Sequence, residues 1–432
     1  MREARILRNI VLGILALAVA IAAFFIFYHP PMRLMPVPLL FQDGTADQGF
    51  DLGPALADGS RLDVFYATSR LPVGSRENRV YTVAPDGRLH VGRAEMRIGD
   101  EGSTLDQIYE WTTRADSGDR PFIHLERMNE YATLGSEGTA AEDAAGWLAE
   151  INAALAESRD KDILVYLHGA NTTVERAAGQ ASQIRHFSGR DAVVVLFAWP
   201  TAENFLRYSR DIRNAIGSAP QVAELLELLA DHTDAERINV FTYSAGATVG
   251  SDALALLARE HPEAAQHLGE VYHAAPDADF RDFVDDLKAY APDAERVTAA
   301  VNLGDSALRL AQIVNRGSRA GRPDLRELSP ESAEWLRQAA GEDGLEVIRV
   351  RPEDMPDLSA SSHTFWYDDP WVSSDVLVTL LFHMPPGERG LETDASMPGA
   401  QYWSYPPDFP DRTRALRERL LARLRGEAPA AP

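Results

Sequence analysis

The stretch Ile238-Asn239-Val240-Phe241-Thr242-Tyr243-Ser244-Ala245-Gly246-Ala247 decides the fold that this sequence predicts. A short apolar run of β-forming residues ends abruptly at a serine among small residues, and residues 248–260 then have a helical pattern. This layout is typical of a nucleophile elbow, in which the serine takes a strained backbone conformation between a strand and a helix. Residues two before and two after the serine must be small. Gly246 satisfies this, whereas Thr242 stands where glycine is usual. The alternative is a chance pattern at a strand end.

Composition limits the classes of protein that need to be considered. The chain has 432 residues, of which 45% are hydrophobic and 25% charged, so we expect one large α/β domain or two smaller ones. A formal charge of −23 argues against binding nucleic acid or anionic lipid through the body of the protein. The chain contains no cysteine, which excludes disulfides, a thiol nucleophile and thiolate metal sites.

The N-terminus carries a predicted membrane anchor. Residues 10–28 are an unbroken apolar run, roughly 28 Å long as a helix, which is enough to span a hydrocarbon core. Arg2, Arg5 and Arg8 precede it, so residues 1–9 should stay in the cytoplasm and the remainder should be in the periplasm or outside. A cleaved signal peptide is the alternative, because residues 16–18 and 20–22 resemble cleavage sites. Residues 29–60 are predicted to be a linker.

Residues 61–384 have the pattern of one α/β domain. Strands are predicted at 62–67, 89–98, 163–168, 193–198, 238–243, 270–274, 297–303 and 345–350. Helices are predicted at 140–158, 174–186, 221–231, 248–260, 280–290, 306–314 and 330–340. The first two strands have no helix between them, which suggests an antiparallel start. We therefore expect a mostly parallel sheet of about eight strands with helices on both faces.

Three segments are harder to assign. Residues 99–136 are polar and irregular, and residues 201–220 are expected to form either a small cap over the site or a connection with one short helix. Residues 385–432 are expected to be a wrap rich in proline and aromatic residues, followed by a basic amphipathic helix at 411–425. Leu416, Leu420 and Leu424 form its apolar stripe, which would lie on a membrane surface or, as we favour, on the protein itself.

A nucleophilic serine needs a base and an acid, and in this fold class they follow it in the order acid, then histidine. His363 alone lies in a polar loop after the last predicted strand. Asp305 follows the strand at 297–303, although it could equally cap the helix that starts at 306. Asp277 or Asp279, after the preceding strand, is the rival acid, and we favour Asp305.

An oxyanion would need two backbone donors. We expect them to be the amides of Ala245, directly after the serine, and of Ala170, in the loop that follows the strand at 163–168. Gly169 permits close backbone approach there. His168 precedes the serine in the chain, so we expect it to be a structural hydrogen-bonding residue and not the base.

Several motifs in order resemble a bacterial α/β-hydrolase family of unknown function, whose pattern runs V-H-G-Y-N, F-S-W-P-S and A-H-S-M-G. The matching segments are Val165-Tyr166-Leu167-His168-Gly169-Ala170-Asn171-Thr172-Thr173, Glu175-Arg176-Ala177-Ala178, Leu196-Phe197-Ala198-Trp199-Pro200-Thr201, Asp63-Val64-Phe65-Tyr66-Ala67-Thr68-Ser69-Arg70, His90-Val91-Gly92-Arg93-Ala94-Glu95, Ala274-Ala275-Pro276-Asp277 and Ser362-His363. The resemblance covers about residues 62–381. The chain departs from the pattern where Thr242-Tyr243 replaces Ala-His and Ala170 replaces Tyr.

The resemblance implies an α/β-hydrolase fold with Ser244 as nucleophile, Asp305 as acid and His363 as base. We therefore expect a membrane-anchored serine hydrolase, similar to esterases and lipases, that acts on a small-molecule or lipid-like ester through an acyl-enzyme. An acyltransferase, a peptidase and a catalytically decayed, membrane-tethered binding module are the alternatives. The expected reaction needs neither a metal nor an organic cofactor, and nothing in the sequence indicates the oligomeric state.

Overall fold

The computed structural model describes residues 5, 9–17, 19–20, 31–42, 59–115, 118, 120–135, 139–340, 344–394 and 402–424. The anchor predicted at residues 10–28 lies partly outside these ranges, since residues 18 and 21–28 are not among them. Within the described ranges, no helix combines the length and the apolar character that crossing a bilayer requires.

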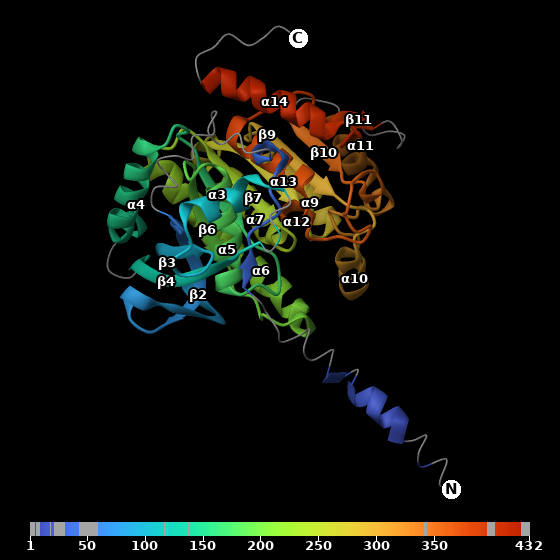
Figure 1. Cartoon of the computed structure of the whole chain (residues 1–432), viewed down its shortest axis with the longest axis horizontal. Coiled ribbons are helices and arrows are strands. Elements are labelled where there is room, and N and C mark those ends of the chain that lie inside the picture. Colours follow the sequence, from blue (N-terminus) through green and yellow to red (C-terminus); the bar gives the residue numbers. More distant parts are fainter. Residues whose placement is uncertain are drawn as a thin grey trace.

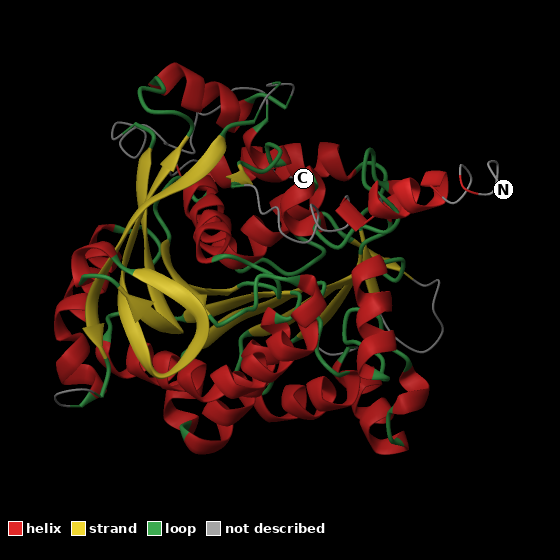
Figure 2. Ribbon diagram, turned by 90° about the horizontal axis from the view of Figure 1, so that it is seen from below, coloured by secondary structure: helices red, strands yellow, loops and turns green. Residues whose placement is uncertain are grey.

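A single sheet runs through the molecule (Figures 1 and 2). Its strands are β1 (Met32–Arg33), β2 (Arg61–Val73), β3 (Val80–Ile98), β4 (Phe122–Thr133), β5 (Ile163–Leu167), β6 (Val193–Ala198), β7 (Ile238–Tyr243), β8 (Leu268–Ala274), β9 (Arg296–Val301), β10 (Leu345–Arg349), β11 (Glu392–Asp394) and β12 (Tyr402–Ser404). Their order is β1-β4-β3-β2-β6-β5-β7-β8-β9-β10-β12-β11. Every pairing from β2 to β12 along this order is parallel, and the pairings at both edges are antiparallel.

Helices cover both faces of this sheet (Figure 2). The α-helices are α3 (Leu105–Thr113), α4 (Ala140–Glu157), α5 (Val174–Phe187), α6 (Tyr208–His232), α7 (Gly246–Glu260), α8 (Pro262–Ala265), α9 (Phe280–Tyr290), α10 (Ser306–Asn315), α11 (Pro330–Ala339), α12 (Phe365–Asp368), α13 (Pro370–Phe382) and α14 (Phe409–Leu424). Short 3₁₀ turns are η1 (Leu39–Phe41), η3 (Arg76–Asn78), η4 (Phe205–Arg207), η5 (Leu325–Glu327) and η6 (Pro352–Asp354). The predicted α/β class and mostly parallel sheet are confirmed.

The predicted number of strands was wrong, because the described residues alone form a sheet of twelve strands and not about eight. β4 lies in the segment 99–136 that had no assignment. It is an outer antiparallel strand with one solvated face, and its charged residues hide the apolar alternation. β1, β11 and β12 are only two or three residues long, too short to give a period in the sequence.

Alternating side chains of the central strands build two apolar cores, one on each face. Tyr166 of β5 and Leu196 of β6 join the core beneath α5, α13 and α14. Val165 and Val195, their chain neighbours, join the other core, beneath α4, α6, α7 and α9. Both faces of the central strands are therefore buried, as expected for a doubly covered parallel sheet.

Residues 31–42 and α14 both reach the core that contains Tyr166, which corrects the predicted linker and agrees with the favoured position of the C-terminal apolar stripe. Leu34 and Leu40, in the stretch 29–60 that was predicted to be a linker, are almost fully buried against it. In the C-terminal wrap, β12 pairs with β10, and the ring centroid of Phe409 of α14 lies 5.6 Å from that of Trp371 of α13. Leu416 and Leu420 of α14 are buried in the same core, so the apolar stripe packs on the protein itself.

The segment 201–220 does not form a separate small cap. Residues 201–207 are a loop ending in η4, and α6 begins at Tyr208 and continues to His232. The helix predicted at 221–231 is therefore the second half of a longer helix that includes Pro220.

Candidate active site

Ser244 lies in a sharp turn between β7 and α7. Its φ of 53° is in the left-handed region, which is unusual for a residue other than glycine, asparagine or aspartate. The amide of Ser244 donates to Ala274 O (3.0 Å) on β8, and Ser244 O accepts from the amides of Ala247 and Asp277 (2.9 Å each). A Cβ at position 246 would lie 2.4 Å from Leu167 O, so only glycine fits there. The turn has the geometry expected of a nucleophile elbow.

Thr242, the unusual residue of the elbow, is accommodated by two neighbours. A Cβ on Gly250, one turn into α7, would lie 2.6 Å from Thr242 Cγ2, so the missing side chain at 250 makes room for the extra methyl group. Thr242 Oγ1 lies 2.7 Å from Nδ1 of the buried His273 on β8. The β-branched residue thus packs away from the serine.

Ser244, His363 and Asp305 form one hydrogen-bonded row. His363 Nε2 lies 2.7 Å from Ser244 Oγ, and His363 Nδ1 lies 2.6 Å from Asp305 Oδ2. The side chain of Asp305 is fully buried, whereas that of His363 is 18% exposed. The other oxygen of Asp305 accepts from the amides of Ala307 and Leu308 (2.8 and 3.0 Å) and caps α10. Asp305 therefore contacts the histidine and caps the helix at once, through different oxygens.

The end of β9 holds the loop that carries His363. Asn302 Nδ2 donates to Ser362 O (2.8 Å), directly before the histidine, and more weakly to Ala360 O (3.4 Å). A Cβ on Gly304 would lie 2.4 Å from Ala360 O, so glycine permits the close approach of the two chains. The same turn thus orients the carboxylate and the loop of its partner.

Asp277, the rival acid, has other partners. Its Oδ1 accepts from Arg319 Nε (2.5 Å), and its Oδ2 accepts from the hydroxyl of Tyr208 at the start of α6 (2.6 Å). Asn315 Nδ2 of α10 also donates to that hydroxyl (3.1 Å). Asp279, the other rival, caps α9 through the amide of Arg281. Asp305 is the acid that contacts His363.

The loop after β5 lies against the serine. A Cβ on Gly169 would lie 2.9 Å from Ser244 Cβ, which places the backbone before Ala170 at the nucleophile. Ala245 is the N-cap residue of α7, so its amide is at the positive end of a helix of 15 residues. Neither the Ala170 nor the Ala245 amide donates to a backbone carbonyl in the described part of the chain.

A comparison with protein families identifies the chain. The model of one family, described as an alpha/beta hydrolase of unknown function (DUF900), matches residues 143–377, which is more than half of the chain. The chain belongs to this family. The match includes Ser244, Asp305 and His363, and the family resemblance expected from the sequence is confirmed.

Comparisons with individual proteins add little to this assignment. Among solved structures, this α/β-hydrolase matches a predicted CIB-like hydrolase from Thermoplasma acidophilum with 13% identity and a TM-score of 0.29, over 52% of this chain and 88% of the other. It matches a Pyrobaculum calidifontis esterase with 16% identity and a TM-score of 0.25, over 63% and 78%. It matches one of two fungal esterases from Rhizomucor miehei with 12% identity and a TM-score of 0.31, over 85% and 94%. No curated protein matches the chain.

Arg70 of β2 holds the loops beside the serine, a role that the sequence did not predict. Its guanidinium is fully buried and donates to Thr172 O (3.0 Å), Trp199 O (3.0 Å) and Glu203 Oε1 (2.9 Å). Asp211 of α6 similarly accepts from the amides of Asn171 (3.0 Å) and Ala202 (2.5 Å). Arg70 is the last residue of one of the segments that resemble the family. That resemblance was the feature of the sequence that could have pointed to its role.

His168 is next to this loop and is not a base. Its ring stacks on Trp199, with centroids 5.2 Å apart and an interplanar angle of 7°. Burial, and to a lesser degree the charge of Arg70, lower the pKa of His168 to about 3, so the ring is neutral near pH 7. Trp199 Nε1 donates to His168 O (2.7 Å), and the residue is thus part of the scaffold.

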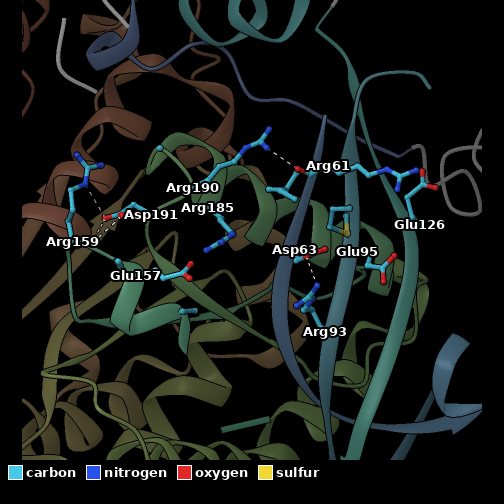
Figure 3. Close-up of a pocket in the computed structure, with 15 residues that line it drawn as sticks. Arg61, Asp63, Arg93, Glu95, Glu126, Glu157, Arg159, Arg185, Arg190 and Asp191 are labelled. Carbon is cyan, nitrogen blue, oxygen red and sulfur yellow. Dashed lines mark hydrogen bonds and ion pairs between the residues drawn. The ribbon is translucent and has the colours of Figure 1, made fainter. Parts of the chain in front are cut away.

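A large charged cavity lies elsewhere in the molecule. It measures about 900 Å³ and lies between the beginning of β2, β3, the end of α4 and the loop before β6 (Figure 3). Arg93 pairs with Asp63 (3.0 Å) and Arg159 with Asp191 (3.5 Å) along its wall. β2 and β6 are parallel, and the cavity lies at their N-terminal ends. Ser244 follows the C-terminal end of the parallel strand β7, so this cavity is not part of the candidate site.

Proposed function

We propose that the chain is a serine hydrolase of carboxylic esters, with Ser244 as nucleophile, His363 as general base and Asp305 as the residue that orients His363. The observation that carries the proposal is the hydrogen-bonded row from Asp305 through His363 to a serine held at φ 53°. The buried carboxylate beside Nδ1 favours the tautomer that leaves Nε2 free to accept the serine proton.

In the proposed reaction, Ser244 Oγ attacks the ester carbonyl carbon as its proton passes to His363 Nε2. The amides of Ala170 and Ala245 would donate to the resulting oxyanion, each worth about 3 kcal/mol of transition-state stabilisation. The tetrahedral intermediate collapses, and the leaving alkoxide takes the proton from Nε2. Water then gives a proton to His363, attacks the acyl-enzyme, and releases the acid and free Ser244.

We propose that the protein recognises its substrate through an apolar, lipid-like acyl group. This is supported by α10, whose N-cap residue is Asp305 and which exposes Leu310 (40%), Ile313 (71%) and Val314 (46%). Leu206 (74% exposed) precedes α6, whose Tyr208 hydroxyl accepts from Asn315 of α10. Tyr208 also donates to Asp277, whose amide donates to Ser244 O, and on this basis we propose that the exposed side chains form an apolar rim near the candidate nucleophile. Exposed apolar patches are typical of binding sites.

Ester hydrolysis by the purified full chain tests the proposal. We expect release of carboxylate from esters of increasing acyl length, and loss of that activity in Ser244→Ala. Transfer of the acyl group to an alcohol in preference to water would indicate an acyltransferase. Cleavage of a matched amide at a comparable rate would indicate a peptidase.

We also propose that residues 10–28 anchor the protein in the membrane with the catalytic domain outside the cytoplasm. The support is the apolar run and the preceding Arg2, Arg5 and Arg8. Fractionation of cells that express the full chain tests this. The protein should stay in the membrane pellet after alkaline extraction, and removal of residues 10–28 should release it. Release of the full chain would contradict the anchor.

A further inference from the structure

A polar cluster lies at the N-terminal ends of the central strands, whereas Ser244 lies at their C-terminal ends. Asp160 and Asp162 directly precede β5, and His383 directly follows α13. β5 and β7 are parallel neighbours in register from their first residues, and Ser244 follows the far end of β7. The length of β7, roughly 20 Å, therefore separates this cluster from the candidate nucleophile.

The three side chains bring metal-binding atoms together. One donor atom each of Asp160, Asp162 and His383 lie within 4.8 Å of one another. His383 Nε2 is already 3.0 Å from Asp162 Oδ2. Zinc bonds to nitrogen and oxygen of about 2.0–2.2 Å place neighbouring ligand atoms about 3.3 Å apart in a tetrahedron, so small side-chain rotations are sufficient.

Residues around the cluster have the positions of an outer coordination shell. The second ring nitrogen of His383, Nδ1, faces Glu270 Oε1 at 3.5 Å. Asn239 Nδ2 donates to Asp162 Oδ2 (3.0 Å). A histidine that binds a metal usually presents its other ring nitrogen to a carboxylate, and ligating carboxylates are themselves hydrogen-bonded.

Two buried carboxylates of this cluster each have an oxygen that accepts no hydrogen bond from the described residues. The Asp162 side chain is 3% exposed and that of Glu270 fully buried, and Asp162 Oδ1 and Glu270 Oε2 accept no hydrogen bond from the described residues. Lys161 points away, since its Nζ donates to the carbonyls of Leu155, Ala156 and Ser158. Arg237 lies 3.9 Å from Asp162 Oδ1 and is shared with Glu295. Glu270 already pairs through Oε1 with Arg296 (2.7 Å), whereas Asp162 has no arginine or lysine nearer than Arg237 among the described residues. Burial of a carboxylate without a close cation is costly, and an ion bound at Asp162 would relieve that cost.

We propose that Asp160, Asp162 and His383 bind one Zn²⁺ ion, with His383 contributing Nε2 and with Glu270 as the carboxylate behind the histidine. An imidazole together with carboxylates favours zinc over Mg²⁺ or Ca²⁺, which prefer oxygen ligands alone. Asp160 and His383 are partly exposed, which gives the ion a path from solvent. The ion would join the end of α13 to the start of β5 and so stabilise the fold, without taking part in the chemistry at Ser244.

Zinc binding by the full chain tests the proposal. The protein is first stripped of metal with a chelator and is then titrated with Zn²⁺ in competition with a chromophoric chelator. The wild type should bind one tight Zn²⁺ ion. His383→Gln and Asp160→Asn should each weaken that binding by at least about 100-fold, the upper range for loss of an outer-shell partner alone. His261→Gln is the matched control, since His261 lies apart from the cluster in a pair with Glu227 (2.7 Å).

Thermal unfolding provides a second readout that does not depend on the proposed activity. Zn²⁺ should raise the Tm of the wild type and of His261→Gln, because a ligand that binds only the folded state stabilises it, and should leave the Tm of His383→Gln unchanged. Ester hydrolysis should be the same with and without Zn²⁺. Equal zinc affinity in the wild type and both cluster variants, or no zinc binding by the wild type, would overturn the proposal and leave an ion-pair cluster around a protonated His383.

Discussion

Thr242 and Gly250 are a complementary pair, because the space that a Cβ at position 250 would occupy is filled by the Thr242 methyl group, with 2.6 Å between the two atoms. The chain thus places a β-branched residue two positions before its elbow serine. We expect Gly250→Ala to destabilise the protein by about 1–3 kcal/mol through overpacking. Denaturant unfolding measures this change.

The double variant Thr242→Ser/Gly250→Ala is the control for that prediction. Serine removes the methyl group and keeps the hydroxyl beside His273. The added alanine should then be tolerated, and it should gain up to about 1 kcal/mol of helix propensity relative to Thr242→Ser alone. The same loss of stability from Gly250→Ala in both backgrounds would show that the two residues are not coupled.

Two substitutions of Asp305 should separate its contact with His363 from its role as the cap of α10. Asp305→Asn keeps an oxygen for the cap of α10 but gives His363 Nδ1 the wrong partner, so kcat should fall by roughly 10,000-fold with little loss of stability. Asp305→Ala should show the same loss of kcat and an additional loss of about 1 kcal/mol in unfolding free energy, because the cap is removed as well. Kinetics and unfolding of both variants measure this. Near wild-type activity of the stable Asn variant would exclude Asp305 as the orienting acid.

Buried neutral histidines should make stability depend on pH. Burial lowers the pKa of His186 to about 3, whereas the unfolded value is 6.5. The unfolded chain therefore takes up a proton below about pH 6.5 that the folded chain does not, so stability falls as the pH drops from 6.5 toward 3. Between pH 7 and pH 5 the loss from this residue should be about 2 kcal/mol.

His186→Gln measures that contribution. Its unfolding free energy should fall less than that of the wild type between pH 7 and pH 5, by about 2 kcal/mol. Identical slopes for the wild type and His186→Gln would mean that His186 takes up its proton in the folded state over the same pH range as in the unfolded chain.

The apolar rim on α10 should contribute to recognition of the acyl chain. Ile313→Ser removes the most exposed apolar side chain of that helix. KM for a long-chain ester should rise by about tenfold, the equivalent of about 1.4 kcal/mol of lost apolar contact, and KM for an acetate ester should not change. Val80→Ser, at the start of β3, is the matched control with 62% exposure. An equal rise for acetate would argue against a role in chain recognition.

An element of the fold could be predicted from the sequence where neighbouring residues alone show its pattern. The central strands β5 to β10 are short apolar runs between helices, so the parallel part of the sheet could be recognised. β4 could not, because its solvated face carries Glu126 and Arg127 within the strand. The stretch 31–42 looked like a linker because its prolines hide the fact that Leu34 and Leu40 reach the core.

The candidate site was predictable where chain order limits the choice. Few histidines follow Ser244, and of the two beyond the last central strand only His363 lies in the polar loop before the final helices, so it could be chosen by order. Asp277 remained a rival because its partners Arg319 and Tyr208 are 42 and 69 residues away, which no local pattern reveals. The cluster of Asp160, Asp162 and His383 could not be predicted for the same reason, since more than 200 residues separate His383 from the two aspartates.

Reaction of the full chain with a fluorophosphonate probe tests the central claim, an activated Ser244, most directly. The wild type should be labelled at Ser244, and both Ser244→Ala and His363→Ala should lose the label. Ser251→Ala, on the helix α7 that follows Ser244, should be labelled like the wild type. A folded wild-type chain that takes no label, or one that is labelled equally in Ser244→Ala, would contradict the account.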